Sequence, residues 1–120
     1  LGVVDAVPGI LRAADLFVFP SVKEGLALSV VEAQASGLPT VASTGVPELA
    51  VVSDRACRLP LSDGAEAWAE ACAGELHRAL GTSREDACDQ ARAHGFDIAD
   101  TSARLAAFYR AAAEGKDARW

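Results

Sequence analysis

Two glutamates stand out because they lie in a segment that is otherwise free of charge. Glu24 and Glu32 are separated by seven residues in "EGLALSVVE". A carboxylate among apolar neighbours needs hydrogen-bond donors, because burying it unpaired is costly. Sugar hydroxyls are donors of that kind. We therefore treat the two glutamates as candidate ligand-binding groups.

The backbone amides between the two carboxylates are a second candidate. If a helix begins near Leu28, the amides of Gly25, Leu26, Ala27 and Leu28 lie at its N-terminus, where the helix dipole favours a phosphate. Glu32 would then lie roughly 6 Å along the helix, at 1.5 Å per residue. One carboxylate would flank each side of a phosphate site. This arrangement suits a nucleotide sugar, which has hydroxyls at both ends and a diphosphate in the middle.

Both glutamates also have a simpler interpretation. Ser29 and Glu32 have the spacing of a capping box, in which the serine caps a helix that starts at Val30 and the glutamate bonds back to the serine N–H. Glu24 can equally be a solvated loop residue. The start of the helix separates these alternatives, because a start at Leu28 favours the ligand site and a start at Val30 favours the cap.

The first 60 residues predict strands that alternate with helices. Apolar runs too short for a helix occur at residues 16–19 and 40–43, and they are typical of strands covered on both faces. Helices are expected over residues 8–14 and 28–36, the second ended by Gly37. The pattern predicts an α/β fold with a Rossmann-like parallel sheet and flanking helices. Glu24 would follow the carboxyl end of a strand, where open parallel sheets bind ligands.

The remainder of the chain predicts a helical segment with helices over residues 64–80, 83–94 and 98–114. Capping residues mark the starts and glycines the ends: Asp63 with Glu66, Thr82 with Glu85, and Asp97, followed by Gly81, Gly95 and Gly115. The last helix carries one apolar stripe, which predicts that it packs back onto the first half: Ile98, Leu105, Phe108 and Tyr109.

We expect a single domain over residues 1–120, divided into three parts: an α/β part (1–60), a helical part (61–115) and a tail (116–120). The chain is 51% hydrophobic and 23% charged, as in a soluble globular domain. Its net charge of −6 argues against nucleic acid as a partner. The three cysteines are far apart and odd in number, which favours a reduced, cytoplasmic setting over disulfides or a zinc site. No signal peptide or membrane span of about 20 apolar residues is seen.

Several motifs together resemble the retaining GT-B glycosyltransferases of the group 1 family, also called family 4. They occur in the order found in the C-terminal domain of that family, around the Glu-x7-Glu of "EGLALSVVE": "ILRAADLFVFPSVKEG", "EAQASGLPTVAS", "TGVPEL" and "LPLSDGAEAWAEA". The resemblance covers nearly the whole chain. The segment "EAQASGLP" is similar to members that make exopolysaccharide or capsule.

The resemblance implies a role for each candidate residue. Glu24 would contact hydroxyls of the donor sugar, Glu32 would bind the ribose hydroxyls, and the amides of residues 25–28 would hold the diphosphate. Neither a metal nor another cofactor is implied, and the sequence has no Asp-x-Asp. Transfer would retain the anomeric configuration through a same-face mechanism that needs no glycosyl enzyme, with Glu24 as a positioning group.

Two departures from the family pattern bear on function. The family usually has glycine at the position of Ala27, so a methyl group there can crowd a phosphate. The family's Arg and Lys for the diphosphate have no match, since Arg12 and Lys23 are the cations before Glu24. An N-terminal acceptor domain is also missing. We expect a truncated donor-binding domain that is inactive alone.

Three hypotheses follow from these features. The first is part of a glycosyltransferase that uses a UDP-hexose or UDP-N-acetylhexosamine, located in the cytoplasm or at the inner membrane face. The second is a non-catalytic nucleotide-sugar-binding half-domain, or one chain of a split enzyme. The third is a scaffold without a ligand. An exposed sheet edge in a truncated domain would favour self-association.

Overall fold

A three-stranded parallel sheet organises the chain, whose computed structural model describes residues 2–80 and 83–116. The strands are β1 (Phe17–Phe19), β2 (Thr40–Ser43) and β3 (Ala56–Leu59), in the order β1-β2-β3. All four residues of the central strand β2 are buried. The predicted α/β fold with a parallel sheet, flanking helices and a helical C-terminal segment is confirmed.

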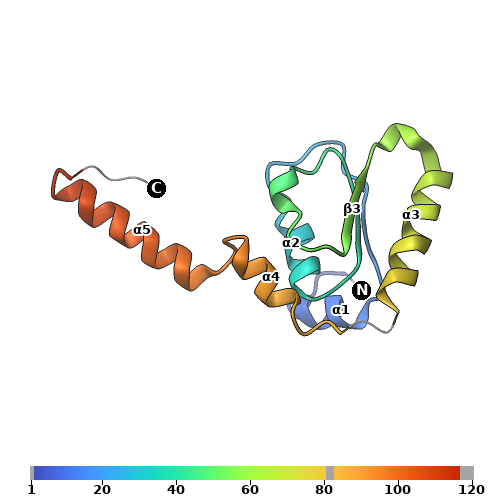
Figure 1. Cartoon of the computed structure of the whole chain (residues 1–120), viewed down its shortest axis with the longest axis horizontal. Coiled ribbons are helices and arrows are strands. Elements are labelled where there is room, and N and C mark those ends of the chain that lie inside the picture. Colours follow the sequence, from blue (N-terminus) through green and yellow to red (C-terminus); the bar gives the residue numbers. More distant parts are fainter. Residues whose placement is uncertain (1, 81–82, 117–120) are drawn as a thin grey trace.

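Helices lie on both sides of the sheet (Figure 1). Helix α2 (Leu28–Ala35) packs on β1 and β2, whereas α3 (Gly64–Ala79) packs on β2 and β3. Helix α4 (Ala87–Ala93) packs against α2. The short helix α1 (Val7–Ala13) precedes β1, and the 3-10 turns η1 (Glu48–Ala50) and η2 (Leu61–Asp63) flank β3.

The core is built mainly from valine and alanine and lies between the sheet and helices α2 and α4. Phe17 and Phe19 of β1 pack against its larger cluster, which is formed by Ala27, Val30, Val31, Ala42, Val46, Ala50, Val52 and Ala91. A smaller cluster joins Leu11 of α1 to Ala33 and Leu38. Helix α2 contributes to both clusters, so the start of this helix is held by the core.

Several predicted boundaries differ from the structure. Strand β3 was not predicted as a strand, because "ACRL" is half-buried throughout and includes a charged residue. Asp63 precedes α3 without a side-chain capping bond. The helix expected over residues 83–94 begins only at Ala87, so Glu85 lies outside it, and Thr82 and Gly81 lie outside the described residues. Asp97 is confirmed as a cap, since its carboxylate accepts from the Ala99 amide at 2.8 Å.

The prediction that the last helix packs back onto the first half is wrong. Helix α5 (Ile98–Ala113) projects from the body (Figure 1) and has no buried residue. Ile98 is 80% exposed and Tyr109 is 63% exposed. The reason is that α4 already covers α2 through Ala87 and Ala91, which are 3% exposed. Phe108 and Tyr109 instead contact each other edge to face, with ring centroids 5.8 Å apart. No helix of residues 2–80 and 83–116 is long and apolar enough to cross a bilayer.

Candidate functional site

Helix α2 begins at Leu28, two residues before the start that a Ser29 cap requires. The residue before the helix is Ala27, in the left-handed conformation with φ 59° and ψ 61°. Ser29 is therefore already inside the helix, and no side chain caps it. The capping-box interpretation is wrong. Among the described residues, Ala27 is the one non-glycine with a positive φ, which explains why glycine suits this position.

The N-terminus of α2 presents backbone amides without protein acceptors. The amides of Val30 and Val31 donate to the Ala27 carbonyl, at 2.9 and 3.4 Å. Within the described part of the chain, no acceptor is found for the amides of the predicted phosphate-binding residues: Gly25, Leu26, Ala27 and Leu28. Free amides at a helix N-terminus bind anions, because the dipole adds to their partial positive charge.

Glu24 is half-buried in the loop that leads from β1 to α2, and the structure holds it at two points. Its backbone amide donates to the carbonyl of Gly45 at 3.0 Å. Its Oε1 accepts a hydrogen bond from the hydroxyl of Ser21 at 2.6 Å. A fully solvated loop residue would have neither contact. The second carboxylate oxygen has no partner among the described residues, so it can accept from a ligand.

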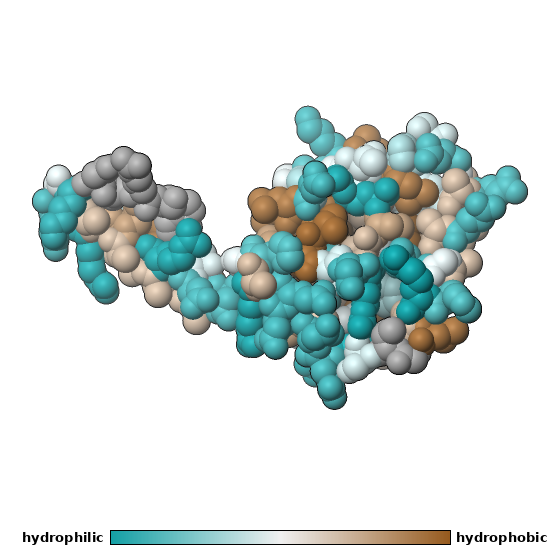
Figure 2. Space-filling view, in the orientation of Figure 1, coloured by the Kyte–Doolittle hydropathy of each residue, from teal (hydrophilic) through white to brown (hydrophobic). Residues whose placement is uncertain are grey.

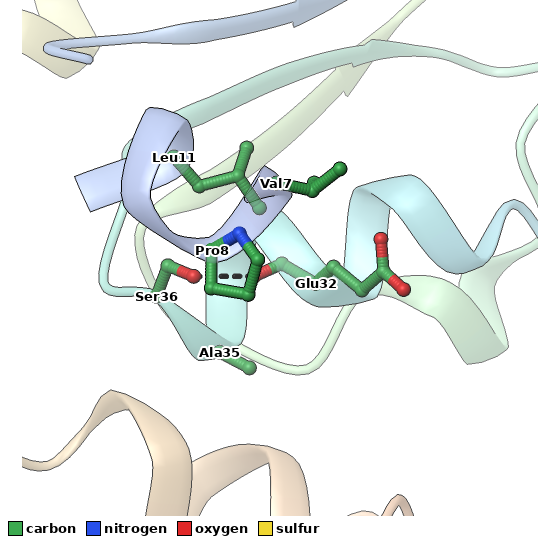
Figure 3. Close-up of a pocket in the computed structure, with 6 residues that line it drawn as sticks. All are labelled: Val7, Pro8, Leu11, Glu32, Ala35 and Ser36. Atoms are coloured by element: carbon green, nitrogen blue, oxygen red, sulfur yellow. Dashed lines mark hydrogen bonds between the residues drawn. The ribbon is translucent and has the colours of Figure 1, made fainter. Parts of the chain in front are cut away.

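Glu32 lies on the exposed face of α2 and lines a pocket of about 280 Å³ between α1 and α2. Figure 3 shows the other lining residues: Val7, Pro8, Leu11, Ala35 and Ser36. The Ser36 hydroxyl donates to the Glu32 backbone carbonyl at 2.9 Å. The Glu32 carboxylate lies at the far end of its side chain from Ser36 (Figure 3). It has no protein partner within residues 2–80 and 83–116.

The structure brings some of the predicted site residues together and leaves one apart. Glu24 and residues 25–27 lie on the loop that follows β1, and Leu28 is the first residue of α2. Glu32 lies on the next turn of α2 and is the one predicted site residue on the pocket against α1. Glu24 is half-buried and Glu32 is exposed.

Sequence analysis missed the residues that hold this loop. The Ser43 hydroxyl donates to the Ser21 carbonyl, and Gly45 accepts from the Glu24 amide. Ser43 is the last residue of β2 and Gly45 follows it, within "ASTGVPEL". The signal was the small residues at the carboxyl end of a second strand. The bond from Ser21 to Glu24 is local and spans just three positions.

Gln34 also escaped attention, although it is fully buried in the motif "EAQASGLP". Its amide nitrogen donates to the carbonyls of Val30 and Ala50, at 2.9 and 2.7 Å. Its carbonyl oxygen accepts from the amides of Val52 and Ser53, at 2.8 and 3.1 Å. The side chain therefore ties α2 to the segment between η1 and β3.

The titratable groups with shifted pKa values lie elsewhere. Burial, and then the nearby Glu75 carboxylate, raise the pKa of Cys57 above its ordinary value of 9.0. The hydrogen bond from Arg78 to Glu75, at 2.6 Å, raises the pKa of the arginine. In the described residues no group of three His, Cys, Asp or Glu side chains could hold a metal.

Lys23 lies in the loop itself and Arg58 lies on β3. Lys23 is exposed. Arg58 on β3 donates to the carbonyl of Val46 at 2.7 Å and pairs with Glu48 at 3.8 Å. The absence of a matching Arg and Lys pair thus remains a departure from the family pattern.

An α/β body in which a helix N-terminus follows a parallel strand is typical of a class of nucleotide-binding folds. The match to a family of sequences identifies the chain more closely than the fold does. Residues 1–77 match the sequence model described as "Glycosyl transferases group 1". The chain therefore belongs to the group 1 glycosyltransferase family.

Three curated relatives agree with this assignment. The chain is 41% identical over 78 residues to "Putative glycosyltransferase EpsF" of Bacillus subtilis (strain 168), covering 61% of this chain and 19% of that protein. It is 49% identical over 43 residues to the "UDP-Gal:alpha-D-GlcNAc-diphosphoundecaprenol alpha-1,3-galactosyltransferase" of Escherichia coli, covering 36% and 11%. It is 38% identical over 104 residues to the "D-inositol 3-phosphate glycosyltransferase" of Corynebacterium glutamicum (strain R), covering 83% and 24%. The chain spans at most 24% of the length of these relatives. No solved structure matches.

Proposed function

We propose that this chain forms the nucleotide-sugar-binding part of a retaining GT-B glycosyltransferase of family 4. Glu24 accepts hydrogen bonds from hydroxyls of the donor sugar. The amides of residues 25–28 bind the diphosphate, and Glu32 binds the ribose. The helix dipole neutralises the leaving diphosphate in part, so no metal is needed at this site.

The observation that carries the proposal is the set of unbonded amides at the start of α2. Glu24 stands immediately before them, and Glu32 lies one turn into the helix. An anion seated on these amides would have a carboxylate on either side. Carboxylates repel phosphates but accept from hydroxyls, so the ligand must place hydroxyls on both sides of its phosphates.

The donor we favour is a UDP-hexose or UDP-N-acetylhexosamine. The name of the Escherichia coli relative includes UDP-Gal, and that protein is 49% identical to this chain over the matched residues. Its acceptor carries a diphosphoundecaprenol lipid, which supports a cytoplasmic site of action at the inner membrane face.

Transfer itself requires groups that we do not find among the described residues, namely an acceptor site and cations for the diphosphate. We propose that an N-terminal domain supplies the acceptor site, and that the 120-residue chain alone binds donor without transferring sugar. Residues 1–60 would then form the α/β part of the domain and residues 61–115 its helical part.

The chain can also associate with itself. Strand β1 pairs with β2 alone, and Val18 on it is 44% exposed. An uncovered apolar strand edge favours pairing with another chain. Sedimentation over a range of protein concentrations tests this, and a monomer at all concentrations would contradict it.

Donor binding is tested with UDP-glucose, UDP-galactose and UDP-N-acetylglucosamine at millimolar concentration. At a concentration one hundred times its dissociation constant, a ligand stabilises the native state by about 2.7 kcal/mol, so we expect a raised melting temperature. Glu24→Gln should weaken binding of the sugar nucleotides but not of UDP, and Glu32→Gln should weaken both. Glu70→Gln, at an exposed position on α3, is the matched control. No ligand-dependent shift in the native chain would contradict the proposal.

A further inference from the structure

We propose that the turn at the carboxyl end of β2, formed by Ser43, Thr44 and Gly45, positions Glu24 for the donor sugar. The inference rests on the proposed function, because it takes Glu24 as the group that contacts the sugar. Ser43 and Gly45 are positioning residues, since each acts on the ligand through the loop that carries Glu24.

The loop from β1 to α2 has no regular secondary structure that could fix Glu24. Residues 20–27 lie between the end of β1 and the start of α2. A carboxylate on such a loop would lose conformational freedom when it binds, which weakens binding. The loop therefore needs an external template if Glu24 is to be oriented beforehand.

Hydrogen bonds from the turn supply that template. The Ser43 hydroxyl donates to the carbonyl of Ser21. Ser21 in turn donates its hydroxyl to the Glu24 carboxylate at 2.6 Å. The carbonyl of Gly45 accepts the Glu24 amide at 3.0 Å. The turn thus fixes the backbone of Glu24 directly and its carboxylate through Ser21, while the second carboxylate oxygen stays available.

Gly45 is required for reasons of space. A Cβ at this position would collide with the carbonyl oxygen of Val22 and lie 2.8 Å from that of Ser21. Gly45 is not among the glycines with positive φ, so its backbone conformation is open to other residues. The missing side chain is what allows the turn and the Glu24 loop to touch.

The turn itself is attached to the central strand of the sheet. Ser43 is the last residue of β2, which pairs on both sides, and it is fully buried. The amide of Thr44 donates to the carbonyl of Leu59 at the end of β3, at 3.1 Å. Glu24 is therefore held in place by the two strands β2 and β3, through contacts that none of its own neighbours in sequence could provide.

The test compares Ser43→Ala with Thr40→Val, using the affinities for UDP-galactose and for UDP. Both substitutions remove a fully buried hydroxyl of β2 that donates to a backbone carbonyl, at opposite ends of the strand. Ser43→Ala should weaken UDP-galactose about fivefold, the effect of one typical hydrogen bond, and leave UDP within about twofold. Thr40→Val should change neither affinity.

Coupling to Glu24 separates positioning from a general loss of structure. In a Glu24→Gln background, Ser43→Ala should have no further effect on affinity, because the two changes act on one interaction. Amide hydrogen exchange at Glu24 should be about tenfold faster in Ser43→Ala than in the native chain. Gly45→Ala should show the same effects, with Gly74→Ala as control because a Cβ there meets no other atom. Should either variant fail to fold, Ser21→Ala tests the carboxylate bond alone.

The possible failures are distinguishable. If the native chain binds neither nucleotide, or if Glu24→Gln leaves both affinities unchanged, the proposed function is wrong, and Glu24 exchange in Ser43→Ala still decides whether the turn holds the loop. If Glu24→Gln weakens UDP-galactose but Ser43→Ala and Ser21→Ala do not, the positioning inference is wrong and the proposed function stands. Equal losses for UDP and UDP-galactose in Ser43→Ala would also overturn the inference.

Discussion

Helices α3 and α5 have the same length, 16 residues, yet only one of them is part of the α/β body. Helix α3 packs on β2 and β3 and buries Glu75. Helix α5 buries nothing and extends the molecule to 56 Å along its longest axis, against 31 and 30 Å along the others. The radius of gyration, 17.1 Å, accordingly exceeds the roughly 14 Å expected for a compact domain of this length.

The difference between the two helices shows that an apolar stripe indicates that a helix can pack, but does not indicate which surface it packs on. Helix α3 lies directly after β3, so the chain returns it to the sheet. Helix α5 follows α4, which already occupies the face of α2. Much of α5 is alanine, and Figure 2 shows the strongest brown on the body and only pale brown and teal on the described surface of α5. Substitutions in the body should therefore change global stability, whereas those in α5 should act locally.

The largest effect is expected for Gln34→Leu. The change removes four hydrogen bonds and leaves the Ala50 carbonyl and the Val52 amide without partners inside the protein. Since each buried unsatisfied group costs about 1–3 kcal/mol, the free energy of unfolding should fall by about 3 kcal/mol or more. Urea unfolding followed by circular dichroism measures the change.

Gln90→Leu is the matched control for that experiment. Gln90 lies on α4, where its side chain donates to Asp86 at 3.0 Å in an exposed bond. Its replacement should change stability by less than about 1 kcal/mol. Equal losses for the two variants would show that Gln34 does not join α2 to the rest of the body in the manner described.

The second largest effect on stability is expected for the ion pair between Glu75 and Arg78 on α3. Glu75 has a side chain that is 8% exposed, and Arg78 contacts both of its oxygens at 2.6 Å. Arg78→Ala should lower the free energy of unfolding by about 1–3 kcal/mol, because it leaves a buried carboxylate without its main partner. Arg92→Ala, which breaks exposed pairs with Asp89 and Asp97, should have a much smaller effect on the free energy of unfolding, because exposed ion pairs contribute little. A larger loss of unfolding free energy in Arg92→Ala than in Arg78→Ala would instead show that α4 and α5 unfold together with the body.

Asp97→Ala tests the independence of α5 itself. Asp97 caps this helix by accepting from the Ala99 amide, and loss of such a cap costs about 1 kcal/mol of helix stability. We expect less helical circular dichroism and faster amide exchange in the first turn of α5, with the unfolding midpoint of the body unchanged. Asp97→Asn keeps the cap but removes the charge that pairs with Arg92, so it should behave like the native chain. A shift of the body's midpoint in Asp97→Ala would contradict the comparison.

The sequence predicted the fold well where local signals and burial agree. Strand β2 consists of small and β-branched residues and is buried at every position, and Gly37 ends α2 with a φ of 73° as expected. Strand β3 escaped because its pattern carries no alternation and includes Arg58, whose charge is satisfied by Val46 and Glu48 from the preceding loop. These contacts form only when the chain folds, so the residues next to Arg58 in sequence do not reveal them.

The candidate site shows the same limit. The positions of Glu24 and Glu32 followed from the strand and helix around them. The contacts that hold Glu24 come from residues 43 and 45, about twenty positions later, and depend on the parallel register of β1 with β2. A small serine and a glycine in a loop have many explanations, and only the structure shows which atoms approach them.

The smallest effect on stability is expected for Ala27→Gly. This substitution also tests directly the departure at position 27, where the family usually has glycine. Glycine should relieve about 1 kcal/mol of left-handed strain, but it removes a buried methyl worth about 0.8 kcal/mol and makes the unfolded chain more flexible. The terms nearly cancel, so the free energy of unfolding should stay within about 0.5 kcal/mol of the native value.

Ligand binding should respond where stability does not. Glycine adopts the left-handed conformation of residue 27 more readily and lets the backbone adjust to an anion, so Ala27→Gly should bind UDP more tightly by about threefold. Ala33→Gly, at a buried right-handed position of the same helix, should lose about 1–2 kcal/mol from helix propensity and burial. It should not gain affinity. Unchanged UDP binding in Ala27→Gly would mean that the left-handed alanine leaves the anion site as open as glycine does.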